Sequence, residues 1–232
     1  MNSKLAFIVF AFFCTRLLAE PWVRPHVVYK PTFLTGYDSL TAGTGYIAKM
    51  GNEYVFLTAH HLFGPAAGLE RDLNPQEAVD FAAALAACSM TDPARVVVSS
   101  DMLLIPSAKT FGDQDASHDV AAFRLFEYQG PSLDIAQTQP KSGEKIYLLA
   151  RPRGEDRLRL LSAVVTRVSP NELEYAYDES GANLAGTSGA PLLNENGEVV
   201  GMNLGGGKTD GKEHGIGNPA ASFSLLVLNA LR

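Results

Sequence analysis

Short apolar runs separated by turn-forming residues make up most of the chain beyond residue 40. Two of these runs, 43–50 and 53–58, flank Gly51-Asn52, and because both residues of that dipeptide tolerate positive φ, the sequence predicts a β-hairpin there. Further strands are predicted at 95–99, 102–105, 120–126, 145–150, 158–168, 172–177, 198–203 and 221–226. Helical patterns do not alternate with these strands, so the chain is predicted to be all-β, with antiparallel strands in a sandwich or barrel.

Two helices and one connecting segment interrupt the strand pattern. Asn74-Pro75-Gln76-Glu77 places Asn at the N-cap, Pro at the first helical position and Glu where its carboxylate can bond back to the cap amide. The Ala-rich run that follows favours a helix up to Cys88, so an inserted helix is predicted near 74–88, with Cys88 as a small buried residue. A short C-terminal helix is predicted at 224–231. The segment 127–143, rich in turn formers, is predicted to connect two domains.

The first nineteen residues have the features of a secretory signal peptide. A basic start with Lys4 precedes an apolar run at 5–14, and Ala19 provides a small residue at a cleavage site. The run is about half of the ~20 apolar residues that span a bilayer, although an uncleaved membrane anchor is an alternative. Bulky aromatic residues before Cys14 argue against a lipid anchor there. We therefore expect an exported protein, periplasmic or secreted, with no stable membrane association after cleavage.

Charge and cysteine content exclude several classes of protein. The net charge is −6 and no stretch of five or six basic residues occurs, so nucleic acid is not an expected partner. Cys14 would leave with the signal peptide, and Cys88 alone forms no intramolecular disulfide, which suits an exported bacterial protein. The side chains of the neighbouring His60 and His61 should point apart, and Cys88 has no partner, so neither a metal site nor a cofactor is expected.

Three segments contain the residue types that acyl transfer requires. These segments are 56–62, 117–125 and 186–192. Taken singly, each has a structural explanation: a histidine at a strand end is usually an ordinary residue, Asp119 could cap a turn, and Ser188 could belong to a tight turn. Taken together, they supply a hydroxyl nucleophile, an imidazole base and a carboxylate to orient the base. The glycines around Ser188 also allow the amides of Gly186 and Ser188 to turn toward one point, where an oxyanion could bind.

The same segments resemble, in order, three motifs of the chymotrypsin-like serine proteases. Thr58-Ala-His-His61 is similar to their Thr-Ala-Ala-His motif, 119–125 to their Asp-Ile-Ala-Leu strand, and Gly186-Thr-Ser-Gly-Ala-Pro191 to their Gly-Asp-Ser-Gly-Gly-Pro motif. The resemblance covers about residues 40–62, 117–125, 144–154 and 184–220, and is closest to compact bacterial members without disulfides. Any one motif would be a weak signal, but three in this order are specific.

This resemblance implies a fold of two antiparallel six-stranded β-barrels with an active site between them. After an N-terminal segment at 20–40, residues 41–126 would form the first barrel, with the predicted helix as an insertion. Residues 144–232 would form the second barrel and the C-terminal helix.

The resemblance also assigns roles to individual residues. His61 would be the general base and Asp119 would orient it. Ser188 would be the nucleophile, and the backbone amides of Gly186 and Ser188 would form the oxyanion hole.

Departures from the family pattern concern activation and specificity. Thr187 stands where digestive members have an Asp that pairs with a newly cleaved N-terminus, so activity should not depend on a free α-amino group. Ala182 stands where trypsin-type members have an acidic specificity residue, so selection of Arg or Lys has no support. Leu204 and Gly205 would line the far wall of the pocket.

The favoured interpretation is an exported serine endopeptidase that acts on protein or peptide substrates. One alternative is a catalytically silent binding module on the same scaffold. A less favoured alternative is an esterase on another hydrolase fold, although only 44 residues follow Ser188, too few to complete a lipase-type sheet.

Overall fold

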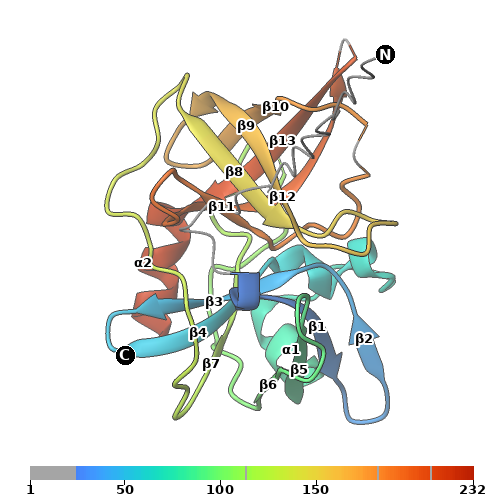
Figure 1. Cartoon of the computed structure of the whole chain (residues 1–232). Coiled ribbons are helices and arrows are strands. Elements are labelled where there is room, and N and C mark those ends of the chain that lie inside the picture. Colours follow the sequence, from blue (N-terminus) through green and yellow to red (C-terminus); the bar gives the residue numbers. More distant parts are fainter. Residues whose placement is uncertain (1–24, 113, 182, 210) are drawn as a thin grey trace, which may run out of the picture.

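Two antiparallel β-sheets, one from each half of the chain, form the molecule in the computed structural model (Figure 1). The structure describes residues 25–112, 114–181, 183–209 and 211–232. The first half contributes β1 (Val28–Leu34), β2 (Ser39–Thr41), β3 (Gly45–Met50), β4 (Glu53–Thr58), β5 (Ala84–Ser89), β6 (Val96–Ser99) and β7 (Ala121–Arg124). The second half contributes β8 (Lys145–Ala150), β9 (Arg159–Val168), β10 (Leu173–Tyr177), β11 (Pro191–Leu193), β12 (Val199–Thr209) and β13 (Lys212–Pro219). The predicted all-β, antiparallel fold is confirmed.

The two sheets differ in how they close. Strands of the second half form a closed six-stranded barrel in the order β10-β13-β12-β11-β8-β9. The first half is a seven-stranded sheet in the order β6-β5-β1-β3-β4-β7, with β2 paired to β1. Its two ends approach through the segment after β6, where Met102 forms an isolated bridge with Phe123 and the Leu103 amide donates to the Ala122 carbonyl at 2.9 Å. The first half thus differs from the expected six-stranded barrel because this segment, predicted as a strand at 102–105, makes only that single bridge.

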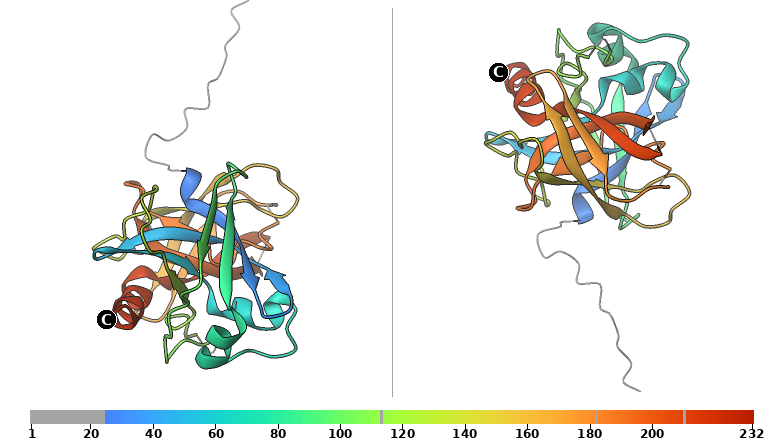
Figure 2. Two further views of the ribbon diagram at one scale, coloured as in Figure 1. Left: turned by 90° about the horizontal axis from the view of Figure 1, so that it is seen from below. Right: turned by 90° about the horizontal axis from the view of Figure 1, so that it is seen from above.

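Each sheet encloses its own hydrophobic core. The larger core lies under the first sheet and includes fully buried Tyr46, Phe56 and Phe123. The smaller core fills the barrel and is built around Leu148 and Tyr175. Viewed from below and from above, the two sheets are stacked on one another (Figure 2). The candidate functional residues come from the loops where the stacked sheets meet.

The inserted helix is shorter than predicted. α1 (Pro75–Phe81) begins with the expected capping box, in which Asn74 accepts from the Glu77 amide and the Glu77 carboxylate accepts from the Asn74 amide. Helix is not continued to Cys88, because 84–89 instead forms β5 and pairs with both β1 and β6. Pairing on two sides satisfies the backbone of this Ala-rich segment, and tertiary context therefore outweighs its helix propensity.

The same correction applies to Cys88, which is exposed rather than buried. Residues of β5 alternate between the two faces of the sheet, with Leu85, Ala87 and Ser89 buried. Cys88 falls on the opposite face. In a helix, residues return to the same face every 3.6 positions, whereas in a strand successive residues alternate between two faces, so the change from helix to strand alters the face on which Cys88 lies.

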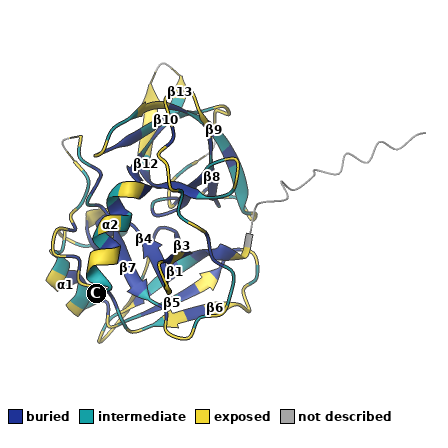
Figure 3. Cartoon of the chain, turned by 90° about the vertical axis from the view of Figure 1, so that its left-hand side faces the viewer, coloured by how far each residue is buried: buried dark blue, intermediate teal, exposed yellow. Residues whose placement is uncertain are grey.

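The chain ends in α2 (Ala220–Ala230), which replaces the strand predicted at 221–226 and starts before the helix predicted at 224–231. It buries Ala220, Phe223 and Val227, which are spaced by three and four residues on one face, in the core of the first sheet. Leu225 is exposed, and the burial colouring of Figure 3 shows that α2 has exposed as well as buried residues. The helix follows the barrel's last strand and packs against β3 of the other sheet, so it ties the two halves together. None of the helices described is long and apolar enough to cross a membrane.

Other predicted elements agree with the structure to within a few residues. The hairpin turns at Gly51, whose φ is +64°, and the strand predicted at 145–150 coincides with β8. Five strands of the structure lie outside the predicted strands, namely β1, β2, β5, β11 and β13. Three short 3-10 helices are also present, η1 (Pro25–Val27), η2 (His60–Phe63) and η3 (Pro65–Ala67). No strand lies within 127–143, which contacts both halves through isolated bridges of Leu133 with Ala48 and of Ile135 with Val199.

Candidate active site

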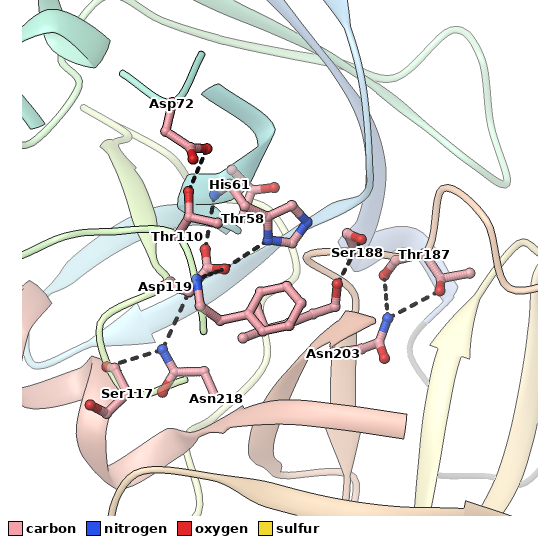
Figure 4. A network of polar contacts seen from close by, with 12 residues as sticks. Thr58, His61, Asp72, Thr110, Ser117, Asp119, Thr187, Ser188, Asn203 and Asn218 are labelled. Carbon is pink, nitrogen blue, oxygen red and sulfur yellow. Dashed lines mark hydrogen bonds and ion pairs between the residues drawn. The ribbon is translucent and has the colours of Figure 1, made fainter. Parts of the chain in front are cut away.

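A buried imidazole–carboxylate pair lies on the first sheet. β4 ends at Thr58, which pairs with Ala121 at the start of β7, so the segments just beyond these two strand ends emerge side by side. His61, in η2 after β4, and Asp119, just before β7, therefore meet. The Nδ1 atom of His61 is 2.8 Å from Oδ2 of Asp119, and both side chains are almost fully buried (Figure 4).

The Asp119 carboxylate is held by further donors. Its Oδ1 accepts from the His61 amide at 2.9 Å, and its Oδ2 also accepts from the Phe111 amide at 3.1 Å. A carboxylate that accepts several N–H groups in a fully buried position is oriented and has its charge compensated. The ring of Phe111 stands edge-on to the His61 imidazole at 5.5 Å between centroids. The imidazole is therefore confined in orientation by both a polar partner and an apolar neighbour.

Asn218 links this part of the first sheet to the barrel. It lies on β13, is fully buried, and its amide nitrogen donates to the carbonyls of Ser117 and Asp119 at 3.2 and 3.3 Å. A side chain of the second half thus fixes the backbone that carries Asp119. Its role was not visible in the sequence, because no local pattern connects positions 99 and 101 residues apart.

The neighbouring His60 points elsewhere, as its adjacency in the sequence predicts. Its Nε2 lies 3.0 Å from the Leu73 carbonyl, and its ring is buried near Phe63. Burial lowers the pKa of His60 below its ordinary value, and the hydrogen bond to Leu73 offsets this only in part. His60 is consequently a structural residue of the first core.

Ser188 lies in a tight turn before β11, at the edge of the barrel. The turn is flanked by Gly186 and Gly189, with φ values of +83° and +87°, which favour glycine. A Cβ on Gly189 would lie 2.1 Å from the Thr44 carbonyl oxygen and 2.6 Å from Oγ1 of Thr58, so the turn is pressed against the first sheet. The Thr44 amide also donates to the Ser188 carbonyl at 2.8 Å. These contacts bring Ser188 next to the segment that carries His61.

The Ser188 hydroxyl donates to the Leu204 carbonyl at 2.9 Å. No hydrogen bond joins it to His61 within the described residues. The amides of Gly186 and Ser188 likewise have no acceptor among the residues that the structure describes. Two amides without partners beside a half-buried hydroxyl are the arrangement expected for an oxyanion site.

A buried polar network holds the turn from behind. The side-chain nitrogen of Asn203 donates to both the carbonyl and the Oγ1 atom of Thr187 at 3.0 Å (Figure 4). The Tyr175 hydroxyl in turn donates to Oδ1 of Asn203 at 2.6 Å, and the Thr187 hydroxyl donates to the Leu184 carbonyl at 2.7 Å. On the other side of the turn, the Thr44 hydroxyl donates to the Gly186 carbonyl at 2.8 Å. Sequence reasoning found Thr187 as a departure from the family pattern but missed Asn203, Tyr175 and Thr44.

Two cavities adjoin the turn, and Gly186 lines both of them. One, which we call the Ser188 pocket, has a volume of about 460 Å³ and is lined by 183–188, 205–208 and Glu213. Gly205 lines it, whereas Leu204 does not: its side chain is buried in the core of the first sheet and its carbonyl accepts from Ser188. Ala182, which stands at the specificity position of the family pattern, lies outside the described residues.

The second cavity, which we call the basic cleft, has a volume of about 680 Å³. It is lined by Lys30, 41–43, 66–67, Met90, 151–156 and Ala185 with Gly186.

Within the described ranges, no three His, Cys, Asp or Glu side chains are arranged to hold a metal ion.

The sequence and the fold were compared with known proteins. Residues 43–202 match the family model of the trypsin-like peptidase domain. Among solved structures, the active form of the Rv3671c protease from M. tuberculosis superposes with a TM-score of 0.59 at 19% identity, covering 98% of this chain and 91% of that chain. The serine endoprotease from Yersinia pestis gives 0.59 at 17% identity, covering 90% of this chain and 64% of that chain.

Kallikrein-related peptidase 10 in complex with Zn²⁺ gives a TM-score of 0.60 at 12% identity, covering 91% of this chain and 96% of that chain. No curated protein matches the sequence significantly. The structural similarities establish that the fold is chymotrypsin-like.

Proposed function

The chain belongs to the trypsin-like peptidase family of serine peptidases, and we propose that it is an endopeptidase with Ser188 as nucleophile, His61 as general base and Asp119 as the group that orients the base. The observation that carries the proposal is the buried contact of 2.8 Å between Nδ1 of His61 and Oδ2 of Asp119, beside a turn that presents Ser188 and two free amides.

The proposed reaction begins when the Ser188 hydroxyl turns from the Leu204 carbonyl toward the Nε2 atom of His61. In proteins without bound substrate, such catalytic hydrogen bonds are often long or absent and form in the substrate complex. The Ser188 oxygen then attacks the scissile carbonyl carbon while its proton moves to Nε2. The negative charge that develops on the carbonyl oxygen is stabilised by the amides of Gly186 and Ser188.

Asp119 supports this step through the other ring nitrogen. Because its Oδ2 accepts from Nδ1–H, the imidazole is held in the tautomer whose Nε2 can take a proton, and the imidazolium that forms is stabilised. His61 then gives the proton to the leaving amine, which departs and leaves an acyl group on Ser188. A water molecule, deprotonated by His61, releases the acyl group and restores the hydroxyl.

The direct test is the change Ser188→Ala, with Ser107→Ala as a matched control on an exposed serine far from this turn in the sequence. Loss of the nucleophile should lower kcat for peptide cleavage by about 10⁶-fold, the cost typical of such triads, whereas the control should keep its activity. Stability should hardly change, because only one hydroxyl is lost. Undiminished peptide cleavage by the Ser188→Ala protein would refute the assignment.

A catalytically silent binding module is the alternative, and the hydrogen bond from Ser188 to Leu204 favours it. The two possibilities differ in the reactivity of the hydroxyl. An organofluorophosphate should label Ser188 in an enzyme and leave it unmodified in a silent module, with mass spectrometry of the intact protein as the measurement.

Export through a signal peptide at 1–19 is part of the same proposal. The basic start, the short apolar run and Ala19 support it. N-terminal sequencing of protein recovered from the periplasm or medium of a bacterial host should start at Glu20. Full-length protein retained in the cytoplasm would contradict the proposal.

A further inference from the structure

The basic cleft gathers positive charge in a chain that is acidic as a whole. Lys30, Arg151 and Arg153 all line it, although the net charge of the chain is −6. Burial, followed by the positive charges of Arg151 and Arg153, lowers the pKa of Lys30. The three cations are therefore close enough to repel one another.

Carboxylates of the described chain do not neutralise this cluster. Two acidic residues also line the cleft, Glu155 and Asp156. The Glu155 carboxylate accepts from Arg159 at 3.0 Å and is already paired, which leaves Asp156 as a single carboxylate beside three cations. Within the described ranges, no ion pair involves Lys30, Arg151 or Arg153. Positive charges that are close together and unpaired make a site for an external anion.

Hydrogen bonds hold the Lys30 ammonium and the backbone of the loop that carries Arg151 and Arg153. The Lys30 ammonium donates to the Gly43 carbonyl at 2.7 Å, and the Arg153 amide donates to the Asn183 carbonyl at 2.9 Å. Arg159 holds the other end of the same loop through Glu155 and Glu179. Lys30 and the loop 151–156 are thus fixed on opposite halves of the molecule, on two sides of one cavity.

The position of the cleft relates it to the proposed chemistry. Gly186, whose amide would bind the oxyanion, lines both this cleft and the Ser188 pocket. If the residue before the scissile bond enters the Ser188 pocket, an extended peptide crosses Gly186 and its leaving-group segment enters the basic cleft. Gly43, which accepts from Lys30, also contacts the Ser188 turn: a Cβ on it would lie 2.8 Å from the Ser188 carbonyl oxygen.

We propose that the basic cleft binds a carboxylate on the leaving-group segment of the substrate, through Arg151 and Arg153 with Lys30, and that the peptidase therefore prefers negative charge just after the scissile bond. The carboxylate could be an acidic side chain or the free C-terminus of the substrate. Arg is suited to this task because its planar guanidinium can donate two hydrogen bonds to one carboxylate. The inference rests on the proposed function, but its test can be separated from it.

Binding to the Ser188→Ala protein tests the inference without catalysis. Fluorescent peptides of one sequence, with Glu or Gln in the first two positions after the expected scissile bond, are compared by anisotropy, each with a free and with an amidated C-terminus. We expect the Glu peptide, or the peptide with a free C-terminus, to bind about tenfold more tightly than its neutral counterpart. The two pairs distinguish a side-chain carboxylate from a terminal one. Equal affinities in both pairs would overturn the inference.

Variants then assign the preference to the cleft. Arg151→Gln combined with Arg153→Gln should bring the ratio of the two affinities close to one, and higher ionic strength should reduce it in the unsubstituted protein. Arg157→Gln is the matched control, because Arg157 is an exposed residue of the same loop region that does not line the cleft. Each ratio compares two peptides on the same variant, so a change in the fraction of folded protein does not affect it. If the double variant is unstable, Arg153→Gln alone, a change at an exposed position, replaces it. A preference that survives these changes would refute the assignment.

Turnover of the same peptides by the unsubstituted protein is measured in parallel. Absence of cleavage together with a binding preference would contradict the proposed function and leave the inference supported. Cleavage without a binding preference would support the proposed function and contradict the inference.

Discussion

The two halves of the candidate site are organised differently. On the first sheet, His61 and Asp119 already make the hydrogen bond that the mechanism needs, and both are buried. On the barrel, Ser188 is only half-buried and its hydroxyl is bonded to Leu204 rather than to His61. The imidazole–carboxylate pair is thus preformed, whereas the hydroxyl has to rotate before it can react.

The difference follows from how each half is held. His61 follows and Asp119 precedes two strands that pair with each other in the first sheet, and Asn218 of the barrel adds hydrogen bonds to the backbone that carries Asp119. The Ser188 turn is instead held by side chains of its own barrel and by Thr44 across the interface. The acid–base pair is brought together by strand pairing within one sheet, whereas contact between the nucleophile and the base depends on how the two halves of the molecule meet.

Apart from removal of the nucleophile itself, the largest effect should come from disrupting the preformed imidazole–carboxylate pair with Asp119→Asn. A carboxamide has a single acceptor oxygen: if that oxygen keeps the bond from the His61 backbone amide, the NH₂ group faces Nδ1 and the Phe111 amide and favours the wrong imidazole tautomer. We expect kcat to fall about 10⁴-fold with little change in KM. Steady-state kinetics on a peptide substrate measures this, and near-normal turnover would show that Asp119 does not orient the base.

Gly189→Ala should weaken the packing of the Ser188 turn against the first sheet. The added Cβ would lie 2.1 Å from the Thr44 carbonyl oxygen at a φ of +87°, so we expect a loss of about 3 kcal/mol or more in the free energy of unfolding. Gly143→Ala is the control, because its φ is +88° but nothing lies within 4 Å of the new Cβ. The control should lose only about 1 kcal/mol from backbone strain. Equal losses in urea unfolding would mean that the turn is not tightly packed against the first sheet.

Asn203→Leu should loosen the half that carries the nucleophile. The change removes both hydrogen bonds to Thr187 and leaves the buried Tyr175 hydroxyl without its acceptor. Because the oxyanion amides would be misplaced, we expect kcat/KM to fall roughly 10- to 100-fold. The free energy of unfolding should fall by about 1–3 kcal/mol. Tyr175→Phe is the comparison, since it leaves the bonds between Asn203 and Thr187 intact. It should reduce stability more than activity. If both variants lost activity equally, the network would act only through global stability.

The smallest effect concerns the pH dependence of stability near the preformed half. Burial lowers the pKa of His60 in the folded protein, so the unfolded chain, with a histidine pKa of about 6.5, binds this proton more tightly. The stability contributed by neutral His60 is fully present above that value and is lost as the pH falls below it. His60→Gln should therefore flatten the fall in unfolding free energy between neutral and mildly acidic pH, measured by urea titration at several pH values. An unchanged slope would contradict this.

Local patterns predicted the parts of the fold that depend on local chemistry. The Gly51-Asn52 hairpin, the capping box at Asn74 and the strand at 145–150 all follow from nearest neighbours in the sequence. The predictions for 84–89 and 221–226 were wrong, because the Ala-rich composition of the first segment favours a helix and the mixed sequence Ala-Ser-Phe-Ser-Leu-Leu of the second fits a strand as well as a helix. Pairing with β1 and β6 decided the first, and packing on the core of the first sheet decided the second.

The sequence by itself determined which residue types could carry the chemistry and in what order, because motifs such as Gly186-Thr-Ser-Gly record local backbone requirements. Only the tertiary structure decided what surrounds them: Asn203 behind Thr187, Asn218 beside the Asp119 backbone, and Lys30 facing Arg151 across a cleft. These contacts join residues far apart in the chain, and a hydrogen bond or a shared cavity depends on distances that the stacking of two sheets sets. No local pattern encodes such distances.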